Sequence, residues 1–283
     1  MNIAWIGLHK GEEPPISKEI GSGTIFFTGC SLHCPFCQNE QISSFHTTFH
    51  TLVSEEELAS YMIELQDIGA ATINLITGTH FIPSIRESLI IAKERGLTIP
   101  IVWNSSGFES IEGLALIDDL IDLYLIDIKT LDEKTSVTYC SYKQYPNVIR
   151  DVVDYLIALD KRTYVDEEGS LFGLLIRHLV FPSSLKSTYE VLDYFSTHLK
   201  ERAHLSLMVQ FINPKERTGE PYISEKEYNE LLDYLDKLGI EDGYVQELED
   251  NVDWIPDFSK ENPFPPHFAS PLASFLEKRG TIQ

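Results

Sequence analysis

The feature that most constrains the fold of this 283-residue chain is a regular alternation of short apolar runs with longer amphipathic segments. Near-continuous apolar runs favour strands of a parallel sheet that is covered on both faces. The expected strands are residues 24–29, 72–77, 98–104, 123–129, 174–181 and 205–211. The expected helices are residues 54–69, 83–95, 109–118, 147–160, 187–199 and 224–238. Six strand–helix units in this order predict an α/β fold, a partial (β/α)6 barrel of the TIM type.

The clearest helix signal lies at residues 54–69, where Ser54 is expected as the N-cap and Glu57 occupies the capping-box position. Gly69 is expected to end this helix, and Gly96 and Gly239 are expected to end two others. No linker divides the chain, so we expect a single domain with a core of about residues 22–240.

Two extensions flank this core, an N-terminal arm of residues 1–21 and a C-terminal extension of residues 241–283. The extension contains "IPDFSKENPFPPHFASP", whose prolines and aromatic residues predict a segment that lies along the surface and does not fold alone. The arm contains "HKGEEPP", for which two placements are open. Its acids Glu12 and Glu13 either fold over the barrel mouth towards substrate or lie in a solvated turn set by the prolines.

Charge and hydropathy exclude several classes of partner. The 44 acidic and 22 basic residues give a net charge of −22, which repels phosphate backbones and anionic lipid surfaces. No run reaches the ~18 apolar residues that a membrane span needs. The N-terminus has neither a signal-peptide nor a transit-peptide pattern. We therefore expect no nucleic-acid partner, no membrane and a cytoplasmic location.

Three of the four cysteines lie in "TGCSLHCPFCQN", directly after the first expected strand. Active sites of β/α barrels lie in the loops that follow the strands, and clustered cysteines in a reducing compartment commonly bind metal. Cys30, Cys34 and Cys37 can hold three irons of a [4Fe–4S] cluster and leave the fourth iron open. Two alternatives remain from spacing alone, a zinc site completed by His33 or His46 and a set of buried structural thiols. The fourth cysteine, Cys140, has no partner spacing and is expected to pack in the core.

The CX3CX2C motif after a first strand resembles the cluster motif of radical S-adenosylmethionine (SAM) enzymes. From about residue 9 to 258, the chain resembles the pyruvate formate-lyase activating enzyme-like proteins of the PflX type. The segments that carry this resemblance are "HKGEEPPIS", "GSGTIFFTGCSLHCPFCQNEQIS", "PIVWNSSGFE", "YLIDIKT", "YPNVIRDV" and "GLLIRHLVFP". The resemblance implies an iron–sulfur oxidoreductase that binds a [4Fe–4S] cluster through the three cysteines and uses SAM to generate a 5′-deoxyadenosyl radical.

The resemblance also implies SAM contacts after the first three strands. Phe36 matches an aromatic residue that leans on the adenine, with plain packing as the alternative. Thr77, Gly78 and Thr79 stand where relatives have a "GGE" motif for the SAM amine, so hydroxyl and carbonyl oxygens replace the carboxylate. Asn104 and Ser105 in "WNSSGF" match a segment under the SAM carboxylate. Asn104 replaces an aspartate there, which argues against an inherited monovalent-cation site.

Two later strands complete the implied site. Asp127 and Lys129 in "IDIK" match an acid and a base of the family, and the lysine is expected to donate to the SAM carboxylate, unless the two form only a rim ion pair. His178 in "IRHLV" matches a histidine near the SAM ribose, with a structural histidine as the alternative.

Three functions remain open at this point. The first is a radical SAM enzyme that activates a glycyl-radical enzyme, with an electron donor such as flavodoxin or ferredoxin and a protein or peptide segment as substrate. The second is radical SAM modification of a small molecule or a peptide side chain. The third is a zinc-binding protein without turnover.

Overall fold

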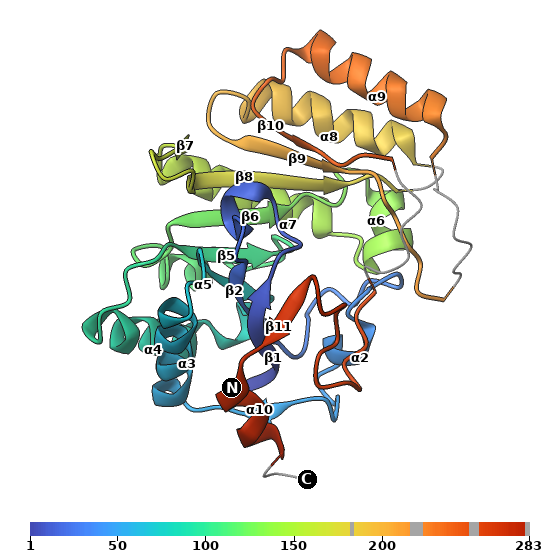
Figure 1. Ribbon diagram of the computed structural model, residues 1–283. Helices are drawn as coiled ribbons and strands as arrows, with labels where there is room; N and C mark the ends of the chain where they lie inside the picture. Colours follow the sequence, from blue (N-terminus) through green and yellow to red (C-terminus); the bar gives the residue numbers. More distant parts are fainter. Residues whose placement is uncertain (182–183, 216–222, 249–254, 281–283) are drawn as a thin grey trace.

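A single sheet organises the computed structural model, which describes residues 1–181, 184–215, 223–248 and 255–280. Its main strands lie side by side in the order β10, β9, β8, β6, β5, β4, β2, β1, β11 (Figure 1). Their bounds are β1 Asn2–His9, β2 Ser22–Phe27, β4 Ile73–Ile76, β5 Ile101–Ser105, β6 Leu123–Asp127, β8 Leu171–Leu179, β9 His204–Met208, β10 Gly243–Val245 and β11 Ala269–Pro271. Neighbours from β10 to β2 are parallel, whereas β1 is antiparallel to β2 and to β11. Within the described residues this order does not close on itself, so the predicted partial barrel is confirmed.

All six predicted strands are present, with ends that differ by a few residues from those expected. The sequence patterns missed β10 at one edge and the antiparallel strands β1 and β11 at the other. They also missed the two-residue strands β3 (Thr51–Leu52) and β7 (Tyr164–Val165), which pair with β1 and β8. Residues 2–9 are therefore not an arm outside the sheet, because β1 pairs with β2 along most of its length.

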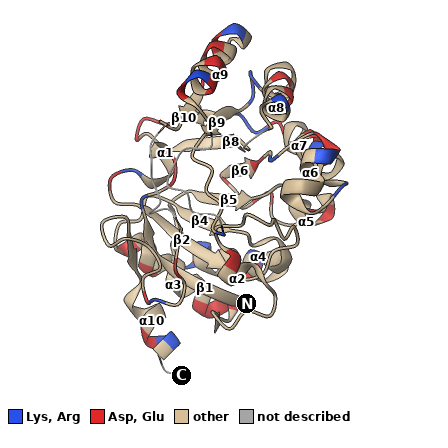
Figure 2. Cartoon of the chain, turned by 90° about the vertical axis from the view of Figure 1, so that its right-hand side faces the viewer, with Lys and Arg blue, Asp and Glu red and all other residues tan. Residues whose placement is uncertain are grey.

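The six predicted helices lie between consecutive strands of the parallel sheet (Figure 1). They are α3 Glu55–Asp67, α4 Ile82–Glu94, α5 Ile111–Ala115, α7 Tyr145–Ala158, α8 Leu185–His198 and α9 Glu225–Leu238. Additional short helices are α1 Pro14–Ser17, α2 Glu40–Ser43, the 3-10 turn η1 Thr79–Phe81, α6 Glu133–Cys140 and α10 Ala273–Gly280. Charged residues lie mainly on helices such as α9 and α10 and on loops, whereas the strands are mostly uncharged (Figure 2).

The predicted start and end of α3 are confirmed. The Ser54 hydroxyl accepts a hydrogen bond from the Glu57 backbone N–H at 3.3 Å, and the Glu57 carboxylate accepts one from the Ser54 N–H at 2.9 Å. Both contacts satisfy donors that would otherwise have no partner in the first turn. Gly69 follows the last turn with φ +92°, a conformation that glycine adopts without steric cost.

The two faces of the sheet bury different sets of side chains. The outer face and the helices form the main core, which includes Leu75, Trp103 and Ile126. Part of the inner face is covered by α1, whose Ile16 is fully buried. Ile16 packs in one cluster with Val102, Leu123, Leu125, Leu171 and Leu175. The N-terminal segment is thus part of the barrel interior, and the carboxyl ends of the strands remain as the place for a site.

The C-terminal extension lies against the antiparallel edge of the sheet. Its β11 pairs with β1, and Phe258 and Phe264 pack with Trp5 and Phe26 in an aromatic cluster. Trp5 and Phe264 meet edge to face with ring centroids 5.3 Å apart. Residues 249–254 and 281–283 of the predicted extension lie outside the described residues.

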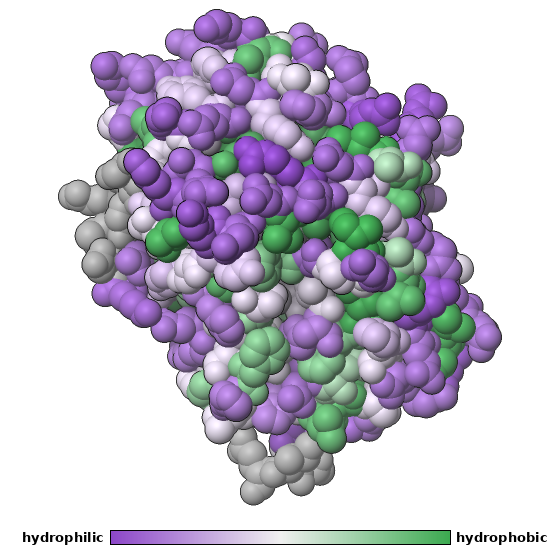
Figure 3. All heavy atoms as spheres, turned by 180° about the vertical axis from the view of Figure 1, so that it is seen from behind, coloured by the Kyte–Doolittle hydropathy of each residue, from purple (hydrophilic) through white to green (hydrophobic). Residues whose placement is uncertain are grey.

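No helix in the part of the chain that the structure describes combines the length and the hydrophobicity that crossing a membrane requires. Seen from behind, hydrophilic residues cover most of the molecular face, and hydrophobic residues form smaller areas between them (Figure 3).

Candidate functional site

The cysteine loop begins at the carboxyl end of β2, as predicted. Cys30, Cys34 and Cys37 are all half-buried and none forms a disulfide. The loop is tied at both ends, because Gly29 N–H donates to Ile42 O at 2.8 Å and Cys37 N–H donates to Cys34 O at 3.2 Å. Three free thiols are therefore presented by one fixed loop at the active-site edge of the barrel.

This set of donors fits a multinuclear cluster. Within the described residues, no three His, Cys, Asp or Glu side chains converge closely enough to hold one metal ion. A [4Fe–4S] cluster takes one thiolate per iron, and the three free thiols of this loop match that donor set in kind and number. Burial and the nearby Cys34 and Cys30 raise the pKa of Cys37 to about 11. Iron would have to replace a proton on this thiol.

A fourth thiol lies beside the loop. Cys140, at the end of α6, is fully buried and shares a side-chain hydrogen bond with Cys34. This contact and burial raise the pKa of the Cys34 thiol. The predicted packing role of Cys140 is confirmed by its burial, but its contact with a motif cysteine was missed. Nothing in its sequence spacing indicated that α6 would return to the cysteine loop.

Asp127 and Lys129 form a largely buried ion pair where β6 ends. The Lys129 ammonium lies 2.9 Å from Asp127 Oδ2, and the two side chains are 15% and 26% exposed. Burial disfavours the lysine charge, but Asp127 outweighs it and holds the pKa of Lys129 well above its usual range. The other carboxylate oxygen, Asp127 Oδ1, is buried without a partner. A charged lysine thus lies beside the cysteine loop, where a bound carboxylate could accept hydrogen bonds from it.

The loops after β4 and β5, which hold two of the predicted SAM motifs, contact each other. The Thr77 N–H donates to Asn104 O at 2.9 Å, and Thr77 has φ +59°, an unusual value for a β-branched residue. Gly78 serves packing, because a Cβ there would lie 2.5 Å from Ile85 Cδ1 of α4. The missing Cβ of Gly78 thus makes room for a core side chain, and the close approach of a ligand to its backbone stays a prediction.

Sequence reasoning missed Glu109, a buried carboxylate that joins these two loops. Its Oε1 accepts hydrogen bonds from Trp103 Nε1 at 2.7 Å and Thr79 Oγ1 at 3.0 Å. Its Oε2 accepts one from Ser105 Oγ at 3.0 Å. Burial raises the pKa of Glu109, although these three hydrogen bonds oppose the shift. A single acid after an expected strand gives no sign that two predicted site hydroxyls will turn towards it.

The His178 side chain turns to the outer face of β8, towards α8. Its neighbour two residues back, Ile176, faces the helices, and residues two apart share a face of a strand. The ring lies between Ile128 O, 2.7 Å from Nδ1, and Thr188 Oγ1 of α8, 3.1 Å from Nε2. Burial lowers the pKa of His178 to about 4. These contacts are those of a structural histidine, the alternative that the sequence left open, and a contact with the SAM ribose stays a prediction.

Phe36 lies in an aromatic cluster next to the cysteine loop. Its ring packs 5.1 Å from Phe181 and 5.1 Å from Phe211, and Tyr139 stacks on Phe181 at 4.2 Å. Cys34 and Leu179 pack against the same cluster. Phe36 itself is only 8% exposed, so packing accounts for most of its surface.

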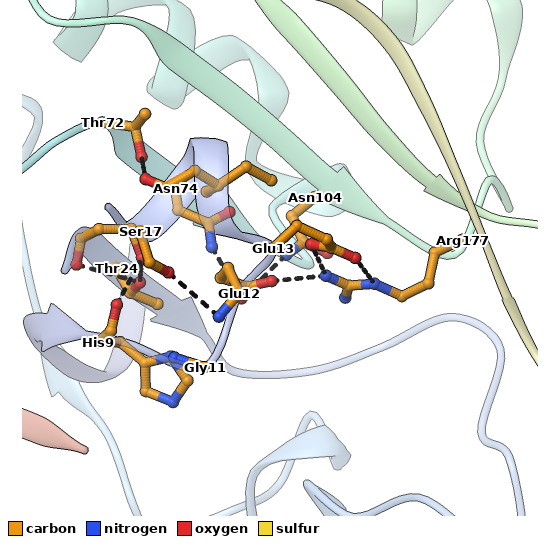
Figure 4. A network of polar contacts seen from close by, with 12 residues as sticks. His9, Gly11, Glu12, Glu13, Ser17, Thr24, Thr72, Asn74, Asn104 and Arg177 are labelled. Carbon is orange, nitrogen blue, oxygen red and sulfur yellow. Dashed lines mark hydrogen bonds and ion pairs between the residues drawn. The ribbon is translucent and has the colours of Figure 1, made fainter. Parts of the chain in front are cut away.

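Both predicted placements of Glu12 and Glu13 are wrong, because the two acids lie inside the barrel (Figure 4). Arg177 of β8 donates to Glu12 Oε2 at 2.6 Å and to the two oxygens of Glu13 at 3.0 and 2.7 Å. Asn74 of β4 donates to Glu12 Oε1 at 2.9 Å, and Asn104 does so at 3.4 Å. Burial alone would raise the pKa of Glu13, but Arg177 outweighs it and the net shift is downward. This network joins the N-terminal segment to the strands β4, β5 and β8 inside the barrel.

Comparison with known proteins gives the family of this chain. The model of the radical SAM superfamily matches residues 24–167 of the 283. An uncharacterised protein of Methanocaldococcus jannaschii is 29% identical over 258 residues, which cover 88% of this chain and 68% of that protein.

Two solved structures share the fold. Methylornithine synthase matches with a TM-score of 0.54 and 15% identity, over 85% of this chain and 77% of that chain. SuiB of Streptococcus suis, solved with bound SAM, matches with a TM-score of 0.52 and 13% identity over 79% of this chain. This chain spans about half of SuiB, since the match covers 48% of that protein.

The matched family segment contains the cysteine loop and the Asp127–Lys129 pair, which are the parts of the site that the structure brings together. The superfamily uses a [4Fe–4S] cluster and SAM, and the three free thiols fit that cluster. The chain therefore belongs to the radical SAM superfamily.

Proposed function

We propose that this protein cleaves SAM reductively and uses the product to abstract a hydrogen atom from a substrate. The observation that carries the proposal is the placement of Cys30, Cys34 and Cys37 beside the charged Lys129 at the carboxyl edge of the parallel sheet. A cluster bound to these thiols would supply the electron that splits the SAM sulfonium into methionine and a 5′-deoxyadenosyl radical. The surrounding side chains bind and orient SAM.

In this proposal Lys129 donates to the SAM carboxylate, with Asn104 and Ser105 beneath that group. The oxygens of Thr77 and Thr79 accept from the SAM amine, and Phe36 borders the adenine. Asp127 keeps Lys129 in place through their 2.9 Å contact. For His178 we favour the structural role, because both of its ring nitrogens already have protein partners.

The test is anaerobic reconstitution with iron and sulfide, followed by iron analysis, absorption near 400 nm and assay of 5′-deoxyadenosine with a chemical reductant. We expect one [4Fe–4S] cluster per chain and reductant-dependent 5′-deoxyadenosine. Alanine replacement of each motif cysteine should abolish the cluster, whereas Cys140→Ala should retain it. Cluster loss in Cys140→Ala with retention in Cys34→Ala would contradict the ligand assignment.

We further propose the activating-enzyme type of reaction, on a glycyl residue of a polypeptide segment, with flavodoxin or ferredoxin as electron donor. The support is the resemblance of the sequence segments to activating enzyme-like proteins, together with a sheet whose strand order does not close on itself within the described residues. A reduced flavodoxin that replaces the chemical reductant in the 5′-deoxyadenosine assay would support the donor.

A second candidate, modification of a small molecule, is favoured by the C-terminal extension. Phe258 and Phe264 cover the inner side of the β1 edge, which narrows the access that a polypeptide loop needs. An assay with a size-fractionated cell extract distinguishes the polypeptide substrate from the small-molecule substrate. Stimulation of 5′-deoxyadenosine formation by the macromolecular fraction supports the first, and stimulation confined to a protease-resistant fraction below about 1 kDa supports the second.

A further inference from the structure

The carboxylate of Glu109 connects two loops of the proposed SAM site from behind. Its side chain is 7% exposed, and all of its described partners are side chains. Thr79 belongs to η1, the first turn after β4, and Ser105 is the last residue of β5. The Ser105 hydroxyl, in turn, accepts from the Gly107 N–H at 3.2 Å. Glu109 therefore determines how both hydroxyls are oriented.

The same two loops are held against the cysteine loop. His80, the residue after Thr79, contacts Thr28 O through Nε2 at 2.7 Å, and Thr28 directly precedes Gly29 and Cys30. Thr77 N–H donates to Asn104 O, which fixes the β4 loop to β5. The Thr79 hydroxyl is thus held near the start of the cysteine loop, and Thr79 itself is partly exposed whereas Glu109 is buried.

The direction of the Thr79 hydrogen bond decides what this hydroxyl can bind. A threonine hydroxyl has one proton and two lone pairs. Trp103 Nε1 can only donate, so Glu109 Oε1 acts as an acceptor. The same oxygen accepts the hydrogen bond of the Thr79 hydroxyl. Thr79 Oγ1 then offers only lone pairs to other groups, and the acid behind it increases its negative character. An ammonium group is the ligand that such an oxygen prefers.

We propose that Glu109 is a positioning residue that acts through Thr79 and makes its hydroxyl an acceptor for the SAM ammonium group. This inference rests on the proposed function. It accounts for a loop without a carboxylate of its own, since the acceptor that orients the Thr79 hydroxyl lies one hydrogen bond away. Glu109 does not touch SAM, and its effect is confined to the amine end of that molecule.

Binding of two ligands to the reconstituted holoenzyme tests this role. SAM carries the ammonium group, and 5′-methylthioadenosine shares the adenosine and sulfur but lacks the amino acid. In Glu109→Gln, which keeps the shape of the side chain, we expect SAM affinity to fall about tenfold to a hundredfold, the size of a charge-assisted hydrogen bond. The affinity for 5′-methylthioadenosine should stay within about twofold, because no amine is present.

Further variants separate this role from a purely structural one. Thr79→Ser keeps the hydroxyl and should retain SAM affinity, whereas Thr79→Val should lose as much as Glu109→Gln. The double variant Thr79→Val/Glu109→Gln should be no weaker than Thr79→Val, because both changes break one relay. The matched control is Trp103→Phe, which removes another donor from Glu109 Oε1 and should not change the ratio of the two affinities.

Equal loss of both affinities in Glu109→Gln, additive losses in the double variant, or unchanged SAM binding in Thr79→Val would each overturn the inference. If Glu109→Gln does not fold, the Thr79→Ser and Thr79→Val pair still decides whether the hydroxyl binds the amine. A wild-type holoenzyme that does not bind SAM would overturn the proposed function as well. Normal SAM binding with an indifferent Glu109 would overturn this inference alone.

Discussion

Lys129 retains its charge although its side chain is 85% buried, because Asp127 lies 2.9 Å away. In Lys129→Met the stem is preserved and the charge is lost, so we expect SAM affinity to fall by about 1.5–3 kcal/mol with the iron content unchanged. Calorimetry on the reconstituted protein measures this. The control is Lys186→Met, since Lys186 is 92% exposed on α8. Equal SAM affinity in Lys129→Met and wild type would make the pair purely structural.

His178 should affect stability and its dependence on pH. Burial lowers its pKa to about 4 from the usual 6.5, so the folded state favours the neutral ring. This contribution is complete above pH 6.5 and is lost as pH falls towards 4, by about 1.4 kcal/mol per pH unit. Between pH 6.5 and 5, urea unfolding should show wild type losing about 2 kcal/mol more than His178→Gln. Parallel losses in the two proteins would contradict this assignment.

The site was predictable from sequence where a residue type and its spacing carried the chemistry. The three cysteines and the Asp127–Lys129 pair lie where the motifs placed them. The directions of the His178 and Glu109 side chains were not predictable, for the same physical reason. Which way a side chain turns at a strand end depends on neighbours from other elements, such as Thr188 for His178 and Thr79 for Glu109.

At the scale of elements, the contact between β8 and the N-terminal segment is the one most sensitive to a single change. Arg177 faces two carboxylates, Glu12 and Glu13, and all three side chains are at most 15% exposed. In Arg177→Met both buried charges lose their partner, which should lower the free energy of unfolding by about 3–5 kcal/mol. Urea unfolding monitored by fluorescence measures this loss.

The matched control for Arg177 is Arg86→Met, because Arg86 pairs with Asp119 at the surface. That change should cost at most about 1 kcal/mol. Adding Glu13→Gln to Arg177→Met should recover part of the lost stability, since one unpaired charge is removed. Similar stability of Arg177→Met and Arg86→Met would show that the buried network is not important for the fold.

The parallel strands and their helices were predictable because each shows its own period in a continuous stretch. The edge strands were not. β10 and β11 have only three residues each, and β1 was hidden in a segment whose charges and prolines suggested a surface arm. The position of "HKGEEPP" depends on Arg177, more than 160 residues away in sequence, so no local pattern could reveal it.

At the scale of the whole molecule, the aromatic cluster joins the beginning of the chain to its end. Phe264 is 9% exposed and packs on Trp5, Phe26 and His9. In Phe264→Ala we expect a loss of about 3–5 kcal/mol, because a large buried ring leaves a cavity. Thermal unfolding measures this loss. The control Leu116→Ala, at a side chain that is 49% exposed, should change stability by less than about 0.5 kcal/mol. Equal losses of stability in Phe264→Ala and Leu116→Ala would mean that the packing of the extension on the β1 edge adds little to stability.

The pairing of the first strand with the last also affects how the protein is made. β1 is synthesised long before one of its neighbours, β11, which begins at residue 269, and the acids that follow β1 wait for Arg177. The N-terminal segment therefore stays without these partners until they have been made. Contacts between such distant segments are slow to form, and exposed strand edges favour aggregation in the meantime. Folding of this barrel should thus be completed only after β11 has been made, with the N-terminal segment among the last parts to settle.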